Sequence, residues 1–324
     1  MKVSVLLPVY NGGGELRQAL DSILRQDLSE FELIVIDDAS TDRSAQVIRR
    51  YAAADSRVRP VYHSRNAGLA STLNEGLETA RGELVARMDQ DDESLPNRLR
   101  VQASFLDAHP EVVVAGSFVY HMGARTDRDR LVRFPTESEE IKRTLQRENC
   151  IYHPSVMFRR RQILELGGYR PQFKNAEDYD LWLRVSKRFE LANIPEPLLR
   201  YRFSVGGMTL SRKWEQLYYV YLAQAAAGTK PFGEAERIAA ARIAQTNRSD
   251  FFTNVASSLV IELIALRLWK DAARVGWRFA KEMGVSRSAR ATLGLLGRYG
   301  RVVRDRPGAR FSAARPDRHA RQTY

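Results

Sequence analysis

The sequence predicts an α/β protein with a mostly parallel central sheet, helices on both faces of that sheet, and a helical C-terminal region. Three observations support this. Apolar, β-branched runs alternate with segments of helical periodicity near the N-terminus, acidic residues follow two of these runs, and helical periodicity alone continues from about residue 211. With 324 residues, 44% of them hydrophobic and 28% charged, the chain does not have the composition of a disordered protein.

The first elements follow from their patterns in chain order. Residues 2–8 and 32–37 are apolar runs rich in β-branched side chains, which is typical of buried strands. Between them, residues 16–24 carry apolar side chains at helical spacing. Residues 40–42 offer N-cap side chains for a helix through residues 47–51. A strand–helix–strand–helix order therefore opens the chain.

The alternation then continues. Residues 57–62 predict a weaker third strand, residues 69–80 a helix and residues 83–88 a fourth strand. A helix at about residues 98–108 precedes a further sheet element at 112–120. Because ligands bind at the carboxyl ends of strands in such sheets, the acidic residues after the second and fourth strands are candidates for a site.

Charge divides the chain into three predicted parts. Residues 1–210 carry 30 basic and 30 acidic side chains, residues 211–286 are helical, and residues 287–324 form an Arg-rich tail that accounts for most of the net charge of +12. The neutral first part argues against a nucleic-acid enzyme, which would need a basic cleft. The tail is a candidate handle for an anionic membrane surface, at about 1 kcal/mol per basic residue, or else a solvated end without a partner.

The sequence predicts a cytoplasmic protein, with peripheral attachment to the inner membrane face through the tail. The longest apolar stretch, Val255–Trp269, is interrupted by Glu262 and Arg267, so it does not read as a membrane span. The N-terminal apolar run is broken at Pro8 and does not resemble a signal peptide. The single cysteine, Cys150, cannot form an internal disulfide.

The segment Asp89-Gln90-Asp91 ends the fourth predicted strand. Residues i and i+2 of an extended segment point the same way, so the two carboxylates can share a Mg²⁺ or Mn²⁺ ion, which prefers oxygen ligands. An EF-hand is excluded, because Ser94 and Arg100 stand where that loop needs Gly and Glu. The alternative is an acidic loop that caps the next helix.

Two further loops carry candidate binding residues. Asp37 and Asp38 follow the second strand, where a carboxylate can accept hydrogen bonds from a nucleobase or ribose, or can simply cap a helix. In the loop after the third strand, Arg65 can stack on a base or reach a phosphate, and Gly68 allows close backbone approach. An ordinary turn is the alternative for this loop.

Glu177 and Asp178 open a predicted helix. Acidic side chains there suit the positive end of the helix dipole, which is the structural interpretation. The functional interpretation makes Asp178 a general base. The sequence leaves both open.

Together these segments resemble the family-2 glycosyltransferases, which are inverting enzymes of the GT-A fold. The segments that carry the resemblance are Val3–Asn11, Val35–Asp42, Arg65–Gly68, Arg87–Asp92, Gly167–Arg170, Glu177–Arg184 and Tyr201-Arg202. The resemblance covers about residues 1–205. It implies a nucleotide-sugar part at about 1–110 and an acceptor part at about 111–210. Residues 211–324 are not covered.

The resemblance also implies roles for single residues. It places Pro8, Tyr10, Asp38, Arg65 and Asn66 around the nucleotide, Asp89 at the ribose or metal side of the donor, Asp91 at the Mg²⁺ or Mn²⁺ ion, and Asp178 as the base with Glu177 beside it. One departure concerns the end of the catalytic region. Many relatives show Tyr-Arg-x-His where this chain reads Tyr-Arg-Phe-Ser at 201–204. Any role of that histidine is absent here or served differently.

The implied activity is a metal-dependent inverting transfer of a sugar from a nucleotide donor, with UDP favoured, to a glycan or lipid-linked acceptor in cell-surface polysaccharide biosynthesis. One alternative is a nucleotidyltransferase acting on sugar phosphates, although Gly12–Gly14 has no basic companion before Arg17. The other is a non-catalytic nucleotide-sugar-binding protein. The amphipathic segment Trp269–Met283 fits packing on the catalytic domain, a dimer contact or a place near a lipid acceptor.

Overall fold

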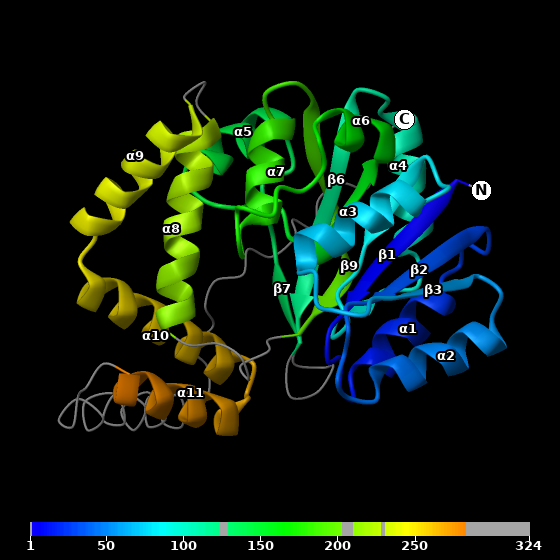
Figure 1. Cartoon of the computed structure of the whole chain (residues 1–324), viewed down its shortest axis with the longest axis horizontal. Helices are drawn as coiled ribbons and strands as arrows, with labels where there is room; N and C mark the ends of the chain where they lie inside the picture. The colour runs from blue at the N-terminus through cyan, green and yellow to red at the C-terminus, as the bar shows by residue number, and fades with distance from the viewer. Residues whose placement is uncertain (1, 123–128, 203–209, 228–230, 283–324) are drawn as a thin grey trace, which may run out of the picture.

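The protein is described by a computed structural model for residues 2–122, 129–202, 210–227 and 231–282 (Figure 1). Its centre is one sheet with the strand order β3-β2-β1-β4-β8-β6-β9-β5, and β7 pairs with β6. The strands are β1 (Val3–Val9), β2 (Phe31–Asp37), β3 (Val58–Tyr62), β4 (Leu84–Arg87), β5 (Glu93–Ser94), β6 (Val112–His121), β7 (Arg130–Val132), β8 (Met157–Arg159) and β9 (Glu190–Tyr201).

The N-terminal half of the sheet is parallel. β1 pairs with β2 on one side and with β4 on the other, and β2 pairs with β3, all in parallel register. In that register Val9 lies opposite Asp37, and Leu6 opposite Arg87. The carboxyl ends of three neighbouring strands therefore meet at one edge of the sheet, where the loops that follow them converge.

Helices cover both faces of the sheet, as the sequence predicted. They are α1 (Leu16–Leu24), α2 (Ser44–Ala54), α3 (Leu69–Thr79), α4 (Arg98–Ala108), α5 (Ser138–Leu145), α6 (Arg160–Glu165), α7 (Glu177–Val185), α8 (Leu210–Ala227), α9 (Phe232–Gln245), α10 (Arg248–Ala265) and α11 (Trp269–Glu282), together with the short 3-10 helix η2 (His153–Ser155). Apolar residues of α1, α2 and α4 pack on one face, and those of α3, α5, α6 and α7 pack on the other.

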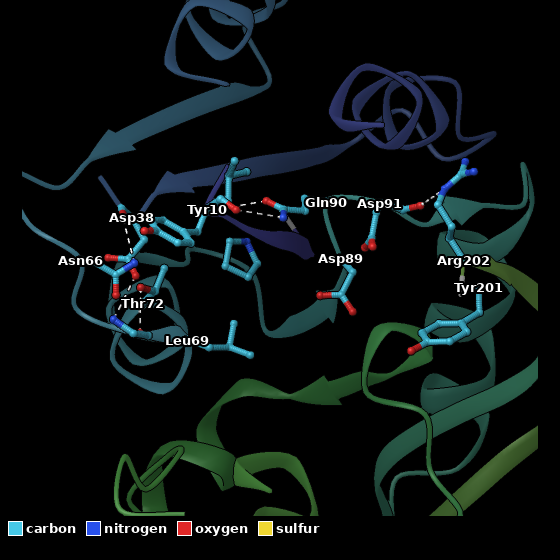
Figure 2. Close-up of a pocket in the computed structure, with 13 residues that line it drawn as sticks. Tyr10, Asp38, Asn66, Leu69, Thr72, Asp89, Gln90, Asp91, Tyr201 and Arg202 are labelled. Carbon is cyan, nitrogen blue, oxygen red and sulfur yellow. Dashed lines mark hydrogen bonds between the residues drawn. The ribbon is translucent and has the colours of Figure 1, made fainter. Parts of the chain in front are cut away.

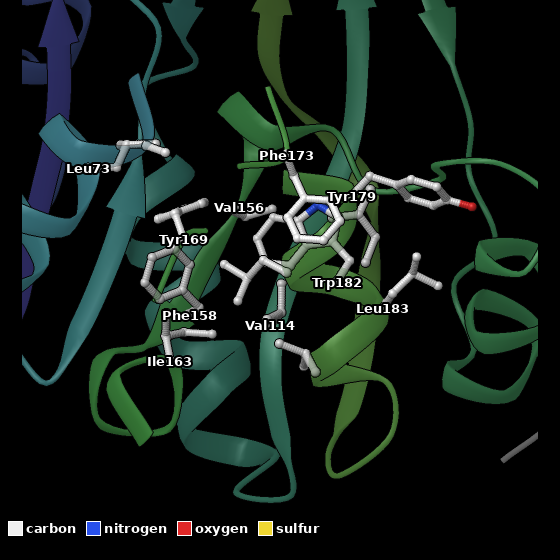
Figure 3. Close-up of a cluster of buried hydrophobic side chains, with 14 of the residues drawn as sticks. Leu73, Val114, Val156, Phe158, Ile163, Tyr169, Phe173, Tyr179, Trp182 and Leu183 are labelled. Atoms are coloured by element: carbon white, nitrogen blue, oxygen red, sulfur yellow. The ribbon is translucent and has the colours of Figure 1, made fainter. Parts of the chain in front are cut away.

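Alternation along the strands creates the two cores. In β1, Val5 and Leu7 belong to the core under α1, α2 and α4, whereas Leu6 belongs to the core under α3 and α7. The second core contains large aromatic side chains, with Trp182 and Tyr169 fully buried in it (Figure 3). It fixes α7 against the sheet, which matters because α7 begins at the candidate base.

The C-terminal helices divide into two pairs. Buried residues of α8 and α9 join the same core as α7, whereas α10 and α11 form a separate apolar cluster that Trp214 of α8 also contacts. Among the described residues, no helix is both long enough and apolar enough to cross a membrane. The Arg-rich tail predicted at 287–324 and the end of the predicted amphipathic segment lie outside the described residues.

The predicted α/β class and the N-terminal elements are confirmed, and the helix-capping alternative for the loop after β4 is not what the structure shows. The acidic loop after β4 does not cap the next helix directly. Glu93 and Ser94 instead pair with Arg200 and Leu199 of β9, and α4 begins only at Arg98. The pairing brings a distant strand against the loop, which local patterns do not reveal.

Candidate active site

A cavity of about 500 Å³ opens at the carboxyl ends of β1, β2 and β4 (Figure 2). Its lining residues are Pro8, Val9, Tyr10, Asp38, Asn66, Gly68, Leu69, Thr72, Asp89, Gln90, Asp91, Tyr201 and Arg202. Seven of the residues singled out from the sequence (Pro8, Tyr10, Asp38, Asn66, Gly68, Asp89 and Asp91) therefore share one cavity. Arg65 is exposed and is not among the lining residues.

Asp38 anchors the loop at one end of the cavity. Its buried carboxylate accepts hydrogen bonds from the backbone N–H groups of Ala67 (2.7 Å) and Gly68 (2.9 Å), and it contacts His63 Nδ1 at 2.7 Å. Burial opposes its charge, but these hydrogen bonds outweigh burial and lower the pKa of Asp38. The Asp38 carboxylate therefore lines the cavity and also fixes the backbone of the loop at residues 67–68.

His63 extends this anchor to helix α3. Its other ring nitrogen, Nε2, lies 2.8 Å from Glu75 Oε2. Burial opposes the charge of His63, but the two flanking carboxylates, Asp38 and Glu75, raise its pKa. Gly68, at the start of α3, has φ +85°, a conformation that side chains rarely adopt. The loop after β3 is thus held in a defined shape.

Tyr10 stands at the same end, with 49% of its surface exposed. Gln90 braces it from the neighbouring loop: Tyr10 N–H donates to Gln90 Oε1 (2.8 Å), and Gln90 Nε2 donates to the Tyr10 carbonyl (3.1 Å). This pair joins the loop after β1 to the loop after β4. Gln90 was not singled out from the sequence, because a side-chain brace between loops has no local pattern.

Asp89 and Asp91 line the other part of the cavity, between Tyr10 and Tyr201 in the view of Figure 2. Burial, followed by repulsion from Asp89, raises the pKa of Asp91 to about 6. A divalent cation would relieve that repulsion, and carboxylate oxygens are the ligands that Mg²⁺ and Mn²⁺ prefer.

The donor set therefore fits such an ion completed by substrate oxygens. Within the described parts of the chain, no group of three or more His, Cys, Asp or Glu side chains is arranged for a metal. Two carboxylates plus substrate phosphates are nevertheless a usual coordination for Mg²⁺. The fit of Asp89 and Asp91 thus depends on a ligand that brings its own oxygens.

Arg202, which follows β9, hydrogen-bonds to the acidic turn formed by residues 89–92. Its N–H donates to Asp92 Oδ1 (2.8 Å) and its Nε donates to the Asp91 carbonyl (2.9 Å). Its Nη2 also donates to Gln18 Oε1 (2.7 Å). The sequence indicated Tyr201 and Arg202 only as part of a family motif. The structure gives them a place, because β9 ends beside the turn.

Glu177 and Asp178, at the start of α7, are not among the residues that line the cavity. Burial, followed by repulsion from Asp178, raises the pKa of Glu177 to about 7. Burial also raises the pKa of Asp178, although Asn149 Nδ2 donates to its Oδ2 at 2.9 Å. Desolvation thus outweighs the hydrogen bonds and the Arg87 charge that favour the ionised carboxylates, a balance that the sequence alone could not give.

Arg87, the last residue of β4, links the two acidic groups and was missed as a functional residue. It is 3% exposed and forms an ion pair with Asp89, and its Nε has no hydrogen-bond partner among the described residues. Its charge offsets part of the rise in the pKa of Asp91 on one side and of Glu177 and Asp178 on the other. Val85 of β4 belongs to the core that α7 covers, and residues two apart in a strand point to the same face. The Arg87 side chain therefore points to the sheet face that α7 covers.

Comparison with known proteins gives a consistent result. The family model described as "Glycosyl transferase family 2" matches residues 4–167. The chain is 33% identical over 229 residues to the amylovoran biosynthesis glycosyltransferase AmsE of Erwinia amylovora, which covers 68% of this chain and 85% of that protein. It is 31% identical to the putative teichuronic acid biosynthesis glycosyltransferase TuaG of Bacillus subtilis, over 68% of this chain and 86% of the relative.

Solved structures share the fold. S. aureus TarS 1–349 in complex with UDP-GlcNAc superposes with a TM-score of 0.57 and 19% identity, over 90% of this chain and 88% of that one. The mannosyltransferase PcManGT of Pyrobaculum calidifontis, in complex with GDP-Man and Mn²⁺, superposes with a TM-score of 0.54 and 18% identity, over 85% and 84%. At these identities the likeness establishes the GT-A-like architecture.

Proposed function

The chain belongs to glycosyl transferase family 2, and on this premise we propose that it transfers a sugar from a UDP-linked donor to a hydroxyl group of a glycan or lipid-linked acceptor, with inversion. Surface polysaccharide biosynthesis is the proposed setting. The observation that carries the proposal is the cavity, which joins Tyr10 and Asp38 to Asp89 and Asp91 in one space. Its volume of about 500 Å³ is in the range typical of pockets that bind small molecules and cofactors.

The Tyr10 and Asp38 end suits the nucleobase. The exposed ring of Tyr10 offers a face for stacking. A carboxylate has about four lone-pair sites, and Ala67, Gly68 and His63 take three of those of Asp38, which leaves one for a nucleobase N–H. Pro8 and Asn66 complete this wall. Contact of Arg65 with the nucleotide stays a prediction, because Arg65 does not line the cavity.

The Asp89 and Asp91 end suits the diphosphate. These residues would hold Mg²⁺ or Mn²⁺, and the ion would neutralise the charge that grows on the leaving diphosphate. The Mn²⁺ and GDP-Man in the complex of PcManGT support this arrangement. Arg202 keeps the turn in place through the Asp91 carbonyl and Asp92.

Asp178 is the proposed base, with Glu177 beside it. A base must accept the proton of the acceptor hydroxyl as the new bond forms, and burial, which raises the pKa of Asp178, strengthens its carboxylate as a base. Attack on the face opposite the leaving diphosphate inverts the anomeric carbon. No covalent enzyme intermediate is needed.

The test is release of UDP from UDP-sugars in the presence of Mn²⁺. We expect turnover by the unaltered chain and its loss by at least about a hundredfold in Asp91→Ala and Asp178→Asn, in the range for removing a positioned charge or base. Asp107→Asn, an exposed carboxylate on α4, serves as the matched control. Nucleotide-sugar binding with the same negligible turnover in all four proteins would favour the non-catalytic binding protein instead.

A second assay addresses the nucleotidyltransferase. That enzyme would release pyrophosphate from a nucleoside triphosphate and a sugar phosphate, whereas the proposed transferase releases a nucleoside diphosphate. A thermal-shift screen of UDP- and GDP-linked sugars with metal present would identify the donor, since a bound ligand stabilises the folded state by mass action.

A further inference from the structure

A polar bridge joins the C-terminal helices to the catalytic sheet. Glu262 of α10 has only 15% of its side chain exposed. Its Oε1 accepts from Arg130 Nε of β7 at 2.8 Å and lies 2.8 Å from His121 Nδ1 of β6. A buried carboxylate is costly unless it is paired and hydrogen-bonded, so this side chain holds α10 in one position against β6 and β7.

The bridge continues inward from His121. Its other ring nitrogen, Nε2, lies 3.0 Å from the Tyr152 hydroxyl. A neutral His121 with its proton on Nδ1 donates to Glu262 and accepts from the Tyr152 O–H, so one tautomer satisfies both contacts. The helix and the tyrosine are therefore connected through a single imidazole.

Tyr201 closes the chain of contacts at the cavity. Its ring centroid lies 5.2 Å from that of Tyr152 in a T-shaped arrangement and 5.7 Å from that of His121. Tyr201 lines the cavity, beyond Asp89 as seen from Tyr10 (Figure 2). The residue that follows it, Arg202, holds the Asp91 carbonyl. The position of Tyr201 thus bears on the cation end of the cavity.

We infer that Glu262 is a positioning residue for the donor cavity: through His121 and Tyr152 it fixes the ring of Tyr201, so that the C-terminal helical region supports the diphosphate end of the site. The inference rests on the proposed function and deepens it. Residue 262 lies outside the part of the chain that the family model matches, so this role belongs to the appended helices. The competing view is that the bridge only attaches α10.

The experiment measures the dissociation constants of UDP and of UMP by calorimetry with Mn²⁺ present, on the full chain. The variants are Glu262→Ala, Tyr152→Phe and both together, and Asp250→Asn is the control that removes the same charge from the same helix. UMP reaches the nucleobase end of the cavity but lacks the second phosphate. A change confined to Tyr201 should therefore weaken the binding of UDP more than that of UMP. A general loosening of the fold should weaken the binding of both ligands equally.

We expect Glu262→Ala and Tyr152→Phe each to weaken UDP binding about 3- to 10-fold, the cost of one lost hydrogen-bonded contact, with little change for UMP. The double variant should bind UDP no more weakly than the single variant with the lower UDP affinity, because both changes break one chain of contacts. Glu262→Gln, which keeps an acceptor for His121, should recover part of the affinity. Asp250→Asn should bind as the unaltered chain does.

Three results would overturn the inference. They are an unchanged UDP affinity in Glu262→Ala and Tyr152→Phe, equal weakening of UDP and UMP, and additive losses in the double variant. If Glu262→Ala does not fold, Tyr152→Phe still decides, since it removes only the hydroxyl that contacts His121. An unaltered chain that binds no nucleoside diphosphate would instead overturn the proposed function, and this inference with it.

Discussion

At the scale of single residues, Arg87 is the cation between two acidic groups. It pairs with Asp89, and its charge opposes the burial that raises the pKa of Asp178 and Glu177, although these residues follow it by about ninety positions in the chain. A buried guanidinium favours the ionised form of several carboxylates at once, because its charge is weakly screened. Arg87 thus couples the proposed cation end of the site to the proposed base.

The first prediction concerns that coupling. In Arg87→Met, the pKa of the base should rise, so the acid limb of the pH dependence of kcat/KM should move to higher pH. Arg87→Lys keeps the charge and should leave the limb near its original position while losing some activity. Circular dichroism would verify folding, because loss of one partner of a buried pair can cost about 3–5 kcal/mol. An unmoved limb in Arg87→Met would refute the coupling.

The second prediction concerns stability and pH at Glu177. Its folded pKa of about 7 lies above the ordinary value of 4.5, so its ionisation favours the unfolded chain. The stability it contributes is fully present below about pH 4.5 and is lost as the pH rises through about 7. Glu177→Gln should therefore increase the free energy of unfolding at about pH 8, by up to about 3 kcal/mol.

Urea unfolding at the two pH values measures this difference. At about pH 4.5 the variant and the unaltered chain should be nearly equally stable, because glutamine resembles a protonated glutamate. Glu139→Gln is the matched control, since Glu139 also lies in the first turn of a helix but has 75% of its side chain exposed. An equal change in both variants would show that burial is not the cause.

At the scale of elements, Gly82 lets β4 begin close beside β1. A Cβ atom at this position would lie 2.6 Å from Ser4 N and 2.8 Å from Val3 C, both backbone atoms. Gly82 N–H also donates to Ser4 Oγ at 2.9 Å. The pairing of β1 and β4, which aligns the two loops of the cavity, thus depends on a residue without a side chain.

The third prediction is that Gly82→Ala lowers the free energy of unfolding by about 2 kcal/mol or more, because strand backbone rather than a flexible side chain must move. Gly14→Ala is the control, as its Cβ would meet nothing within 4 Å. Denaturant unfolding of both variants provides the measurement. Equal stability of the two would mean that β1 and β4 can separate at little cost.

At the scale of the whole molecule, the C-terminal region has two kinds of attachment. α8 and α9 extend the apolar core beneath α7, whereas α10 is held to β6 and β7 through the ion pairs of Glu262. This arrangement attaches α8, α9 and α10 to the catalytic domain, whereas α11 packs on α10. It leaves the tail at 287–324 as the part of the chain for which we propose contact with an anionic membrane.

The fourth prediction tests that contact. Vesicles containing anionic lipid should retain the full chain more than a chain shortened to residues 1–286, because ten arginines are removed. High salt should abolish the difference, since it screens charges between exposed groups. Neutral vesicles serve as the control. Equal retention of the two chains would eliminate a membrane role for the tail.

The sequence by itself determined the α/β class, the N-terminal elements and most residues of the cavity. Periodicity acts over a few residues, and the carboxyl ends of neighbouring parallel strands meet at one edge, so Asp38, Asp89 and Asp91 could be placed together without coordinates. Tyr10 was expected there only from the family resemblance. The catalytic roles of Asp178 and Glu177 and the membrane role of the tail remain predictions.

Only the tertiary structure decided which distant groups reach the site. Arg202 binds a turn 110 positions earlier in the chain, and Glu262 contacts a histidine 141 positions earlier. Local periodicity contains no information about such pairings. They arise when two cores close on one sheet and force buried charges to find partners, because an unpaired charge away from water is too costly to keep.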